Sequence, residues 1–464
     1  MSEIDYNVKR NCIHSLEMPS VLKRDKDLTI KKRRFSDLSV KIENVKEKKV
    51  NFEIKKLVTH NESFFESVWP VIYVAQFMGF MPLQGVRTKD PVKYEFRWKT
   101  IRVLVTLLYF LLGGLIAEMY LQKIAKIGIN AKNIVNLVFY SCCLFGGVLF
   151  LLLAQKFKRL AIAWQRFEKV FLNLPYKECG WRLSTKIRIT AAAISFVAIV
   201  EHIMAQGNTI YNFYMKINIC QVNVNDKWQH FFLYEYPHVF AVLPYNFVFT
   251  IFTQWIITSL TFGWNYMDIF IIVTSIGLAT RFKQINQRLE EMENNPIDEP
   301  LWAEIRHHYV LLCELVETVD KYISGITLLS CTNNLYFICY QLLNIFNVLP
   351  YLINYVYFWF SLSYLIGRTI VLFLIASSIN DAAAYPVKFV RQRRTTEWCS
   401  ELERFGDQIS TQVVALSGMK FFFITRSLLF GMAGTIVTYE LVLLQFDTEG
   451  KNSQNSTSTY CDSI

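Results

Sequence analysis

The sequence lacks the short motifs that mark the common enzyme classes. It contains no P-loop, no GxGxxG following a strand, no HExxH and no nucleophile elbow. Its ten cysteines show no metal-ligand spacing, and no repeat relates one half of the chain to the other. We therefore expect no enzyme, no metal and no other cofactor. The missing repeat also disfavours a secondary transporter, although a membrane transporter is kept as an alternative function.

The chain has too much apolar surface for an ordinary soluble protein. Its 464 residues are 53% hydrophobic and 15% aromatic, with a mean hydropathy of +0.24. A hydrocarbon core about 30 Å thick requires about 20 mainly apolar residues in a helix. We therefore expect an all-α polytopic protein that crosses the plasma membrane several times. Seven runs are long enough to cross: 98–120, 133–154, 189–206, 247–280, 323–346, 352–378 and 419–446.

The other segments differ in composition from these runs. Residues 1–60 are charged and poor in aromatics, which predicts a disordered basic cytoplasmic tail. Residues 61–92 hold a shorter apolar stretch that contains Pro70 and is closed by Pro82, which predicts an interfacial or re-entrant helix. Helices one to six, the last helix and an outer tail are then expected at 93–415, 416–446 and 447–464.

Lysine and arginine set the orientation of the chain. The loops after the second, fourth and sixth runs are rich in both residues, and the loop after the fifth run has none. Because these residues stay on the cytoplasmic side, the N-terminus is expected inside and the C-terminus outside. The net charge of +11 mostly reflects this bias, so no nucleic acid partner is expected. Cys220 and Cys461 fall in expected outside segments, and their pairing stays open.

Seven spans suggest a G-protein-coupled receptor, but the sequence disagrees with that class. The expected orientation is the opposite one. In addition, no Asp-Arg-Tyr ends the third run and no Asn-Pro-x-x-Tyr occurs in the seventh.

The helical pattern that starts at Phe247 continues to Glu293, roughly 70 Å of helix, which would extend well into the cytoplasm. We therefore expect helices that project below the membrane and pack together there.

The last apolar run ends in a specific motif. TYELVLLQF at 438–446 resembles the signature of insect gustatory receptors, in which Thr-Tyr, five mostly hydrophobic residues and Gln-Phe follow one another. Further stretches resemble the sugar-receptor branch of that family. They are the glutamate after Tyr439, AQFMGFMPLQG at 75–85, Glu201-His202, FGWNYMDIF at 262–270 and NNLYFICYQLLN at 333–344.

The resemblance implies a gustatory receptor of sensory neurons that needs no G protein. In this family a mono- or disaccharide binds in the outer half of each subunit and opens a non-selective cation channel. The channel is expected to be a homotetramer, with a heteromer of gustatory receptors kept open, and the last helix of each subunit would line its pore. A subunit tuned to non-sugar ligands is the alternative within the family.

The motif separates into two helical faces. Thr438, Leu441, Val442 and Gln445 follow i, i+3, i+4, i+7 spacing, and the resemblance places this stripe and Phe446 at the pore and gate. An interfacial helix end is the other interpretation of Gln445. Tyr439 and Glu440 are expected to couple gate and pocket, since Glu440 lies about 200° from Thr438 around the helix. Its expected partners are Gln341 or Asn334.

A sugar site needs aromatic platforms together with carboxylates or amides that bind hydroxyl groups. For Glu201, His202 and Asp268 a structural salt bridge is the competing interpretation, and Asp268 is expected either as a pocket floor or as an inner structural partner. Ordinary packing is the competing interpretation for the aromatics, and we favour it for Tyr357. The expected ligand-binding residues are Glu201, His202, Trp264, Asn265, Asp268, Asn333, Asn334, Tyr336, Gln341 and Trp359.

Overall fold

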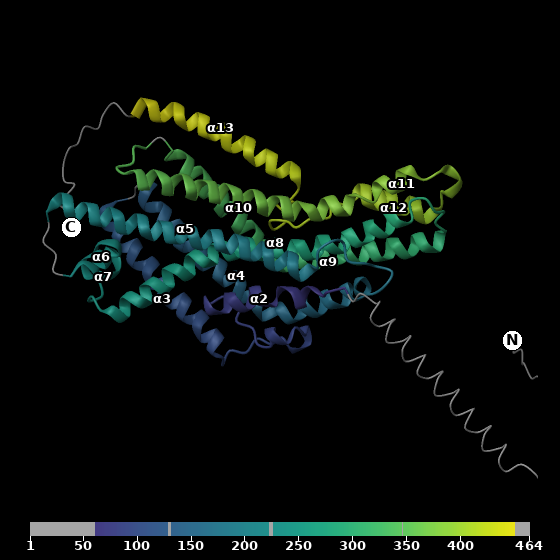
Figure 1. Ribbon diagram of the computed structural model, residues 1–464, viewed down its shortest axis with the longest axis horizontal. Coiled ribbons are helices and arrows are strands. Elements are labelled where there is room, and N and C mark those ends of the chain that lie inside the picture. Colours follow the sequence, from purple (N-terminus) through teal and green to yellow (C-terminus); the bar gives the residue numbers. More distant parts are fainter. Residues whose placement is uncertain (1–60, 129–130, 222–225, 346, 451–464) are drawn as a thin grey trace, which may run out of the picture. The chain divides into compact units, whose positions relative to one another are not determined.

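The computed structural model describes residues 61–128, 131–221, 226–345 and 347–450, and it describes no side chains at 127, 131–133 or 439–450. All of the longer elements are helices (Figure 1). The main ones are α2 (Phe64–Phe77), α3 (Ile101–Ile127), α4 (Ala131–Glu168), α5 (Leu183–Cys220), α6 (Lys227–Glu235), α7 (Pro237–Phe240), α8 (Phe247–Glu291), α9 (Glu299–Leu343), α10 (Leu352–Ala384), α11 (Val387–Gln392), α12 (Ser400–Thr411) and α13 (Arg426–Gly450).

Five of these helices are long and apolar enough to cross a membrane within the described residues. They are α3, α4, α5, α8 and α10, which correspond to the first, second, third, fourth and sixth predicted runs. The fifth predicted run lies in α9, where Asn333 and Asn334 interrupt the apolar stretch. The continuous fourth helix is confirmed, because α8 extends without a break from Phe247 to Glu291.

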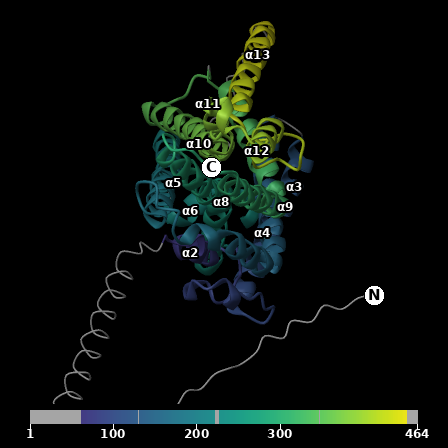
Figure 2. The same ribbon diagram turned by 90° about the vertical axis from the view of Figure 1, so that its right-hand side faces the viewer.

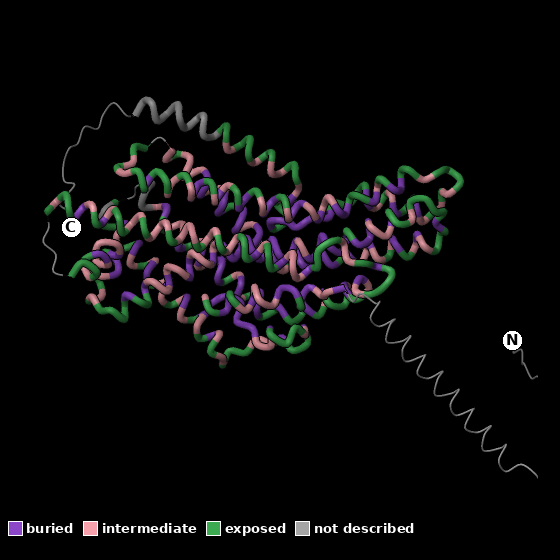
Figure 3. The backbone as a smooth tube through the Cα atoms, viewed as in Figure 1, coloured by how far each residue is buried: buried purple, intermediate pink, exposed green. Residues whose placement is uncertain are grey.

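α8 lies in the middle of the helical bundle. It contacts α3, α4, α5, α9 and α10, and Figure 2 shows it surrounded by other helices. In its most apolar stretch 72% of the residues are buried, compared with 17% in α5. Buried positions accordingly concentrate along α8 (Figure 3). α5 instead turns much of its apolar surface outward, as expected of a helix that faces lipid.

The segment after α2 folds back on itself. Gly79 adopts a φ of +90°, and a side chain there would lie 3.0 Å from Cβ of Tyr109 on α3. Phe80 then packs its ring 5.1 Å from that of Tyr109. The chain then runs back toward the start of α2, where the ring of Tyr94 lies 5.7 Å from that of Phe65. α2 and the segment that follows it therefore enter and leave the bundle on the same side.

A buried ion pair fixes the beginning of α2 against α4 and α8. The Arg281 guanidinium lies 2.6 Å from the Glu168 carboxylate, and both side chains are 1% exposed. Glu168 also accepts hydrogen bonds from the backbone N–H of Phe64, and Arg281 donates one to the carbonyl of Glu62. The Glu62 carboxylate in turn accepts from the backbone N–H of Ser184 on α5. We call these residues the inner clamp.

The last helix begins later than the predicted Met419. Residues 416–425 form a tight turn, in which Met419 and Lys420 both have positive φ. The buried Asp320 carboxylate on α9 holds this turn, because it accepts from Ser417 N–H at 2.6 Å and Ser417 Oγ at 2.8 Å and pairs with Lys420 Nζ at 2.9 Å. The prediction of helix over these residues was wrong, and α13 starts only at Arg426.

Candidate ligand-binding site

A stripe of polar side chains follows one face of α10. Asn354, Tyr357, Ser361, Tyr364 and Arg368 are spaced three and four residues apart, which places them above one another on a helix. The stripe is about 21 Å long. Each member makes a hydrogen bond to a neighbouring helix: Asn354, Tyr357 and Ser361 to α5, and Tyr364 and Arg368 to α8. Polar groups in this apolar helix are therefore directed into the bundle.

The inner end of the stripe is a closed network around an ion pair. Arg368 Nε lies 2.8 Å from Asp268 Oδ2, with the two side chains 2% and 0% exposed. The Asn334 amide donates to both Asp268 oxygens, at 3.2 and 3.0 Å. Its oxygen accepts from Arg368 at 3.0 Å and from Trp264 Nε1 at 3.0 Å. Asp268, Asn334, Trp264 and Arg368 are thus joined to one another, although Arg368 Nε makes an ion pair without a hydrogen bond.

Sequence reasoning missed three residues of this network: Ser330, Tyr364 and Arg368. Arg368 also donates to Asn265, which accepts from the Tyr364 hydroxyl at 2.6 Å. Ser330 donates from its hydroxyl to Asp268. Arg368 could have been found, since an arginine within an apolar run marks a functional or structural site by default. A helical serine and one tyrosine among many carry no comparable signal.

The outer part of the stripe surrounds Glu201 on α5. One oxygen of the Glu201 carboxylate accepts from Tyr357 at 3.2 Å and from Ser361 at 2.9 Å. The Gln341 amide donates to the Ser361 hydroxyl at 3.4 Å, which adds α9 to the cluster. No described residue donates a hydrogen bond to the second carboxylate oxygen of Glu201, and His202 beside it is half-buried. This carboxylate therefore keeps an acceptor for a further group.

The other predicted ligand residues lie apart from these two clusters. Asn333 is 2% exposed, and neither atom of its amide has a partner among the described residues. Tyr336 packs its ring 5.3 Å from that of Phe337. Trp359 is 51% exposed and lies on the side of α10 away from the polar stripe. The structure brings Glu201 together with Gln341, and Asp268 together with Trp264, Asn265 and Asn334. It does not bring Asn333, Tyr336 or Trp359 into either cluster.

Most of the predicted gate lies outside the described side chains. Thr438 is described: it is exposed, and its hydroxyl donates to the Gly434 carbonyl at 2.9 Å. The side chains of Tyr439, Glu440, Leu441, Val442, Gln445 and Phe446 lie outside the described residues, although their backbone belongs to α13. Cys220 is disulfide-bonded, and the other seven cysteines among the described residues form no disulfide. Cys461, whose pairing with Cys220 was left open, lies outside the described residues.

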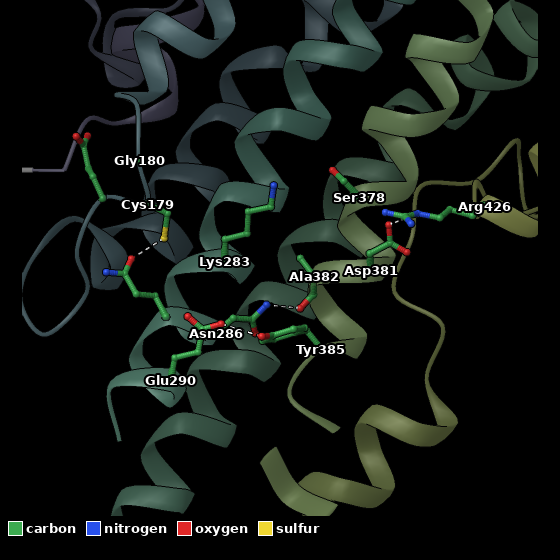
Figure 4. A pocket seen from close by; sticks show the side chains of 12 residues that line it. Cys179, Gly180, Lys283, Asn286, Glu290, Ser378, Asp381, Ala382, Tyr385 and Arg426 are labelled. Carbon is green, nitrogen blue, oxygen red and sulfur yellow. Dashed lines mark hydrogen bonds and ion pairs between the residues drawn. The ribbon is translucent and has the colours of Figure 1, made fainter. Parts of the chain in front are cut away.

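A cleft of about 710 Å³ opens between α8 and α10 near the inner clamp (Figure 4). On one wall Asn286 donates to the carbonyl of Ala382 at 2.9 Å, which ties α8 to α10. On the other wall Asp381 pairs with Arg426 at 2.7 Å, at the first residue of α13. α10 thus connects the polar stripe to the start of the last helix.

An ion pair also joins α9 to α12 in the hub, by which we mean the packed ends of α8 to α12. Arg306 Nε lies 2.7 Å from Glu401 Oε2. The hydrogen bond from Arg306 lowers the pKa of the Glu401 carboxyl below its usual range. This carboxylate therefore stays charged at neutral pH and holds the two helices together through its partner.

The site combines a buried ion-pair network with an open carboxylate, and sequence comparison identifies the family to which the chain belongs. Residues 39–461 match the family described as Trehalose receptor. The chain is 43% identical over 390 residues to the Drosophila melanogaster gustatory receptor for sugar taste 64a, covering 84% of this chain and 86% of that one. The chain belongs to the sugar-receptor branch of the insect gustatory receptors.

Two further relatives support this membership. The Drosophila melanogaster gustatory receptor for sugar taste 61a is 37% identical over 393 residues, covering 84% of this chain and 89% of the relative. Gustatory receptor 5a for trehalose, also from Drosophila melanogaster, is 31% identical over 420 residues and covers 88% and 91%. The gustatory receptor is therefore a multi-pass membrane receptor rather than an enzyme.

The fold also has a solved counterpart. The insect olfactory receptor OR5 from Machilis hrabei in complex with eugenol aligns with a TM-score of 0.56 at 16% identity, covering 83% of this chain and all of that one. A second solved structure of the same receptor aligns with a TM-score of 0.57 at 16% identity, covering 81% of this chain and 97% of that one. This gustatory receptor thus has the insect chemoreceptor fold.

Proposed function

We propose that this gustatory receptor is a sugar-gated, non-selective cation channel of the plasma membrane. The observation that carries the proposal is the outer cluster, in which Glu201 leaves one carboxylate oxygen open beside Tyr357 and Ser361. A carboxylate that binds a pair of sugar hydroxyls next to an aromatic ring is the combination that sugar recognition requires. The membership in the sugar-receptor branch supports the ligand class.

The inner network is proposed as the floor of this pocket. Asp268, Arg368 and Asn334 are already bonded to one another, so a sugar hydroxyl that bound them would have to replace an existing bond. Breaking such a buried network is costly. We therefore assign sugar binding to Glu201, His202 and Gln341 and assign the positioning of α8, α9 and α10 to the network. Asn333, Tyr336 and Trp359 stay predicted ligand residues.

The coupling to the gate is proposed to pass from Gln341 to Glu440. Ile436 on α13 packs against the cluster that contains Phe337 and Leu365. Glu440 lies one helical turn beyond Ile436, just as Gln341 lies one turn beyond Phe337 on α9. The Gln341 amide nitrogen donates to Ser361 alone among the described residues and so keeps a second N–H for a carboxylate, whereas the Asn334 amide nitrogen already donates to both oxygens of Asp268. Of the two partners expected from sequence, Gln341 is the one that we retain.

Topology and assembly complete the proposal. Seven spans are proposed, with α9 and α13 added to the five apolar helices and with the N-terminus inside. Four copies are proposed to surround a pore lined by Thr438, Leu441, Val442, Gln445 and Phe446. In the bound state the sugar favours the arrangement of α5, α9 and α10 that draws α13 away from the axis.

The test is expression of the chain alone in cells without other gustatory receptors, with sugar-evoked cation current recorded. We expect current with at least one mono- or disaccharide, and we expect Glu201→Gln to raise the half-maximal sugar concentration at least about tenfold, since a charge-assisted bond contributes roughly 1.5 kcal/mol or more. Glu118→Gln is the matched control, because this exposed carboxylate on α3 accepts only from Gln122 within the same helix among the described residues.

Two results would contradict the proposal. Sugar uptake without conductance would indicate a transporter, and surface expression without any sugar-evoked current would indicate a different ligand or an obligate partner subunit. Equal effects of the Glu201 and Glu118 variants would reject the assignment of the pocket.

A further inference from the structure

A narrow apolar crevice opens on the surface of the helical bundle between α2, α5 and α8. Its volume is about 410 Å³, within the range of sites that hold one small apolar ligand. α2 contributes Pro70 and Val74, and α8 contributes Tyr266 and Ile269. The crevice shares no residue with the polar stripe of α10 or with Glu201. It is therefore separate from the proposed sugar pocket.

One face of α5 forms the third wall. Arg188, Ala191, Ala192 and Ser195 all line the crevice and follow i, i+3, i+4, i+7 spacing. The three small residues leave the groove open, and Arg188 is the single charged residue among those that line it. Arg188 is exposed, and no ion pair or hydrogen bond joins it to another described residue. An elongated apolar groove thus has one free cation in its wall.

The inner clamp gives the depth of the crevice along each helix. Because Glu62 binds the backbone of Ser184, Arg188 lies about 6 Å beyond the clamp and Ser195 about 16 Å beyond it. Ile269 and Tyr266 lie roughly 18 and 22 Å from Arg281 along α8 by the same measure. Half of a hydrocarbon core is about 15 Å thick. The third and fourth apolar runs end on the clamp side at 189 and 280, so we place Arg188 at the headgroup side and the apolar part toward the middle of the membrane.

We propose that this crevice binds an anionic phospholipid of the leaflet on the side of the inner clamp, which is the cytoplasmic leaflet in the proposed orientation. Its phosphate pairs with Arg188, and one acyl chain lies along Ala191, Ala192 and Ser195 against Pro70 and Tyr266. Charge complementarity selects an anionic headgroup, and the volume of about 410 Å³ and the apolar walls suit a single acyl chain. The lipid then packs between α5, which bears Glu201, and α8, which bears Asp268.

The test uses the full-length receptor in nanodiscs of phosphatidylcholine that contain a photoreactive phosphatidylglycerol or, separately, a photoreactive phosphatidylcholine, each with a diazirine on one acyl chain. Mass spectrometry locates and quantifies the cross-links. We expect cross-links on α2 and on α5 between 188 and 199. We expect Arg188→Gln to lower the preference for phosphatidylglycerol about fivefold, as for the loss of one basic residue near a membrane surface.

Matched variants separate this site from general attraction to the membrane surface. Arg182→Gln removes an exposed arginine six positions earlier that does not line the crevice, and it should change the preference less than about twofold. Ala192→Phe fills the groove and should abolish the cross-links of both lipids, whereas Ala193→Phe places the same side chain at the neighbouring position, which is also exposed but does not line the crevice, and should leave them unchanged. Monodisperse elution of each variant shows that it is folded.

Three outcomes would overturn the inference. The first is an equal loss of preference in the two arginine variants. The second is a cross-link pattern that does not differ between the Ala192 and Ala193 variants. The third is displacement of both lipids by cholesterol, which would assign the groove to a sterol. None of these readouts depends on sugar-evoked current, so the lipid site and the sugar channel can fail independently.

Discussion

Removing the buried charges of the inner network, one at a time and together, tests whether the network is a structural floor. Asp268 and Arg368 pair at 2.8 Å with almost no exposed surface. Loss of one partner from a buried pair typically costs about 3–5 kcal/mol, because the other charge is left uncompensated. Asn265 and Asn334 still bond the remaining partner, so we expect about 3 kcal/mol for Asp268→Asn or for Arg368→Met.

The double variant leaves no unpaired charge. We therefore expect it to lose about 3 kcal/mol instead of the sum of about 6 kcal/mol, a coupling near the upper end of measured values. The assay is thermal denaturation of the solubilised receptor followed by size-exclusion chromatography. If the losses of the single variants add to that of the double variant within about 0.5 kcal/mol, the two charges are not coupled and the reasoning is refuted.

The same variants distinguish a floor from a direct sugar ligand. If the network is a floor, the double variant should reach half-maximal current at a sugar concentration close to that of the unmodified receptor. If Asp268 binds sugar itself, the double variant should stay insensitive even though it is no less stable than either single variant. Current recordings at a series of sugar concentrations measure this directly.

Three further predictions concern other parts of the fold. Gly263→Ala should lower stability by about 1–2 kcal/mol in thermal denaturation, since a Cβ there would lie 2.4 Å from the Phe80 ring, and overpacking outweighs the gain in helix propensity. Arg281→Gln should cost about 3–5 kcal/mol by leaving Glu168 buried and unpaired, seen as a loss of monodisperse receptor. Burial lowers the pKa of His238 on α7 from 6.5 to about 4, so this imidazole is neutral in the folded protein. The free energy of unfolding should therefore fall as pH drops below about 6.5, by about 1–2 kcal/mol at pH 5. His238→Gln should flatten the pH dependence of the denaturation midpoint.

The long membrane helices follow from the sequence because their signal is local. The continuous pattern from Phe247 predicts α8 nearly to its last residue, since an apolar helix needs no distant partner to be recognised. The start of the last helix is different. Residues 419–425 are almost as apolar as the helix that follows, yet Asp320 binds the backbone and side chain of Ser417 from 97 positions away. A local pattern contains no trace of that hydrogen bond.

The candidate site was predictable to the extent that its residues are unusual at their depth. Asp268, Asn265 and Asn334 stand out because carboxylates and amides are rare within apolar runs. Arg368 meets the same criterion and was overlooked. Which polar residues meet one another is set by the rotation of each helix about its axis, and composition does not determine this rotation. The structure, for example, turns Trp359 away from the stripe and turns Tyr357 toward Glu201.

The two carboxylates that bind the polar stripe, Glu201 on α5 and Asp268 on α8, differ in the charge of their partners, and this difference assigns their roles. Asp268 faces the guanidinium of Arg368, whereas among the described residues Glu201 is bonded only by the neutral hydroxyls of Tyr357 and Ser361. A carboxylate that already has a buried cation gains little from a neutral ligand, and displacing the cation would leave both charges unpaired. A carboxylate held by hydroxyls can exchange or add hydroxyl partners at small cost, because the incoming group resembles those already present. A sugar presents such hydroxyls, so its contacts should concentrate at Glu201 while Asp268 keeps the helices in register beneath it.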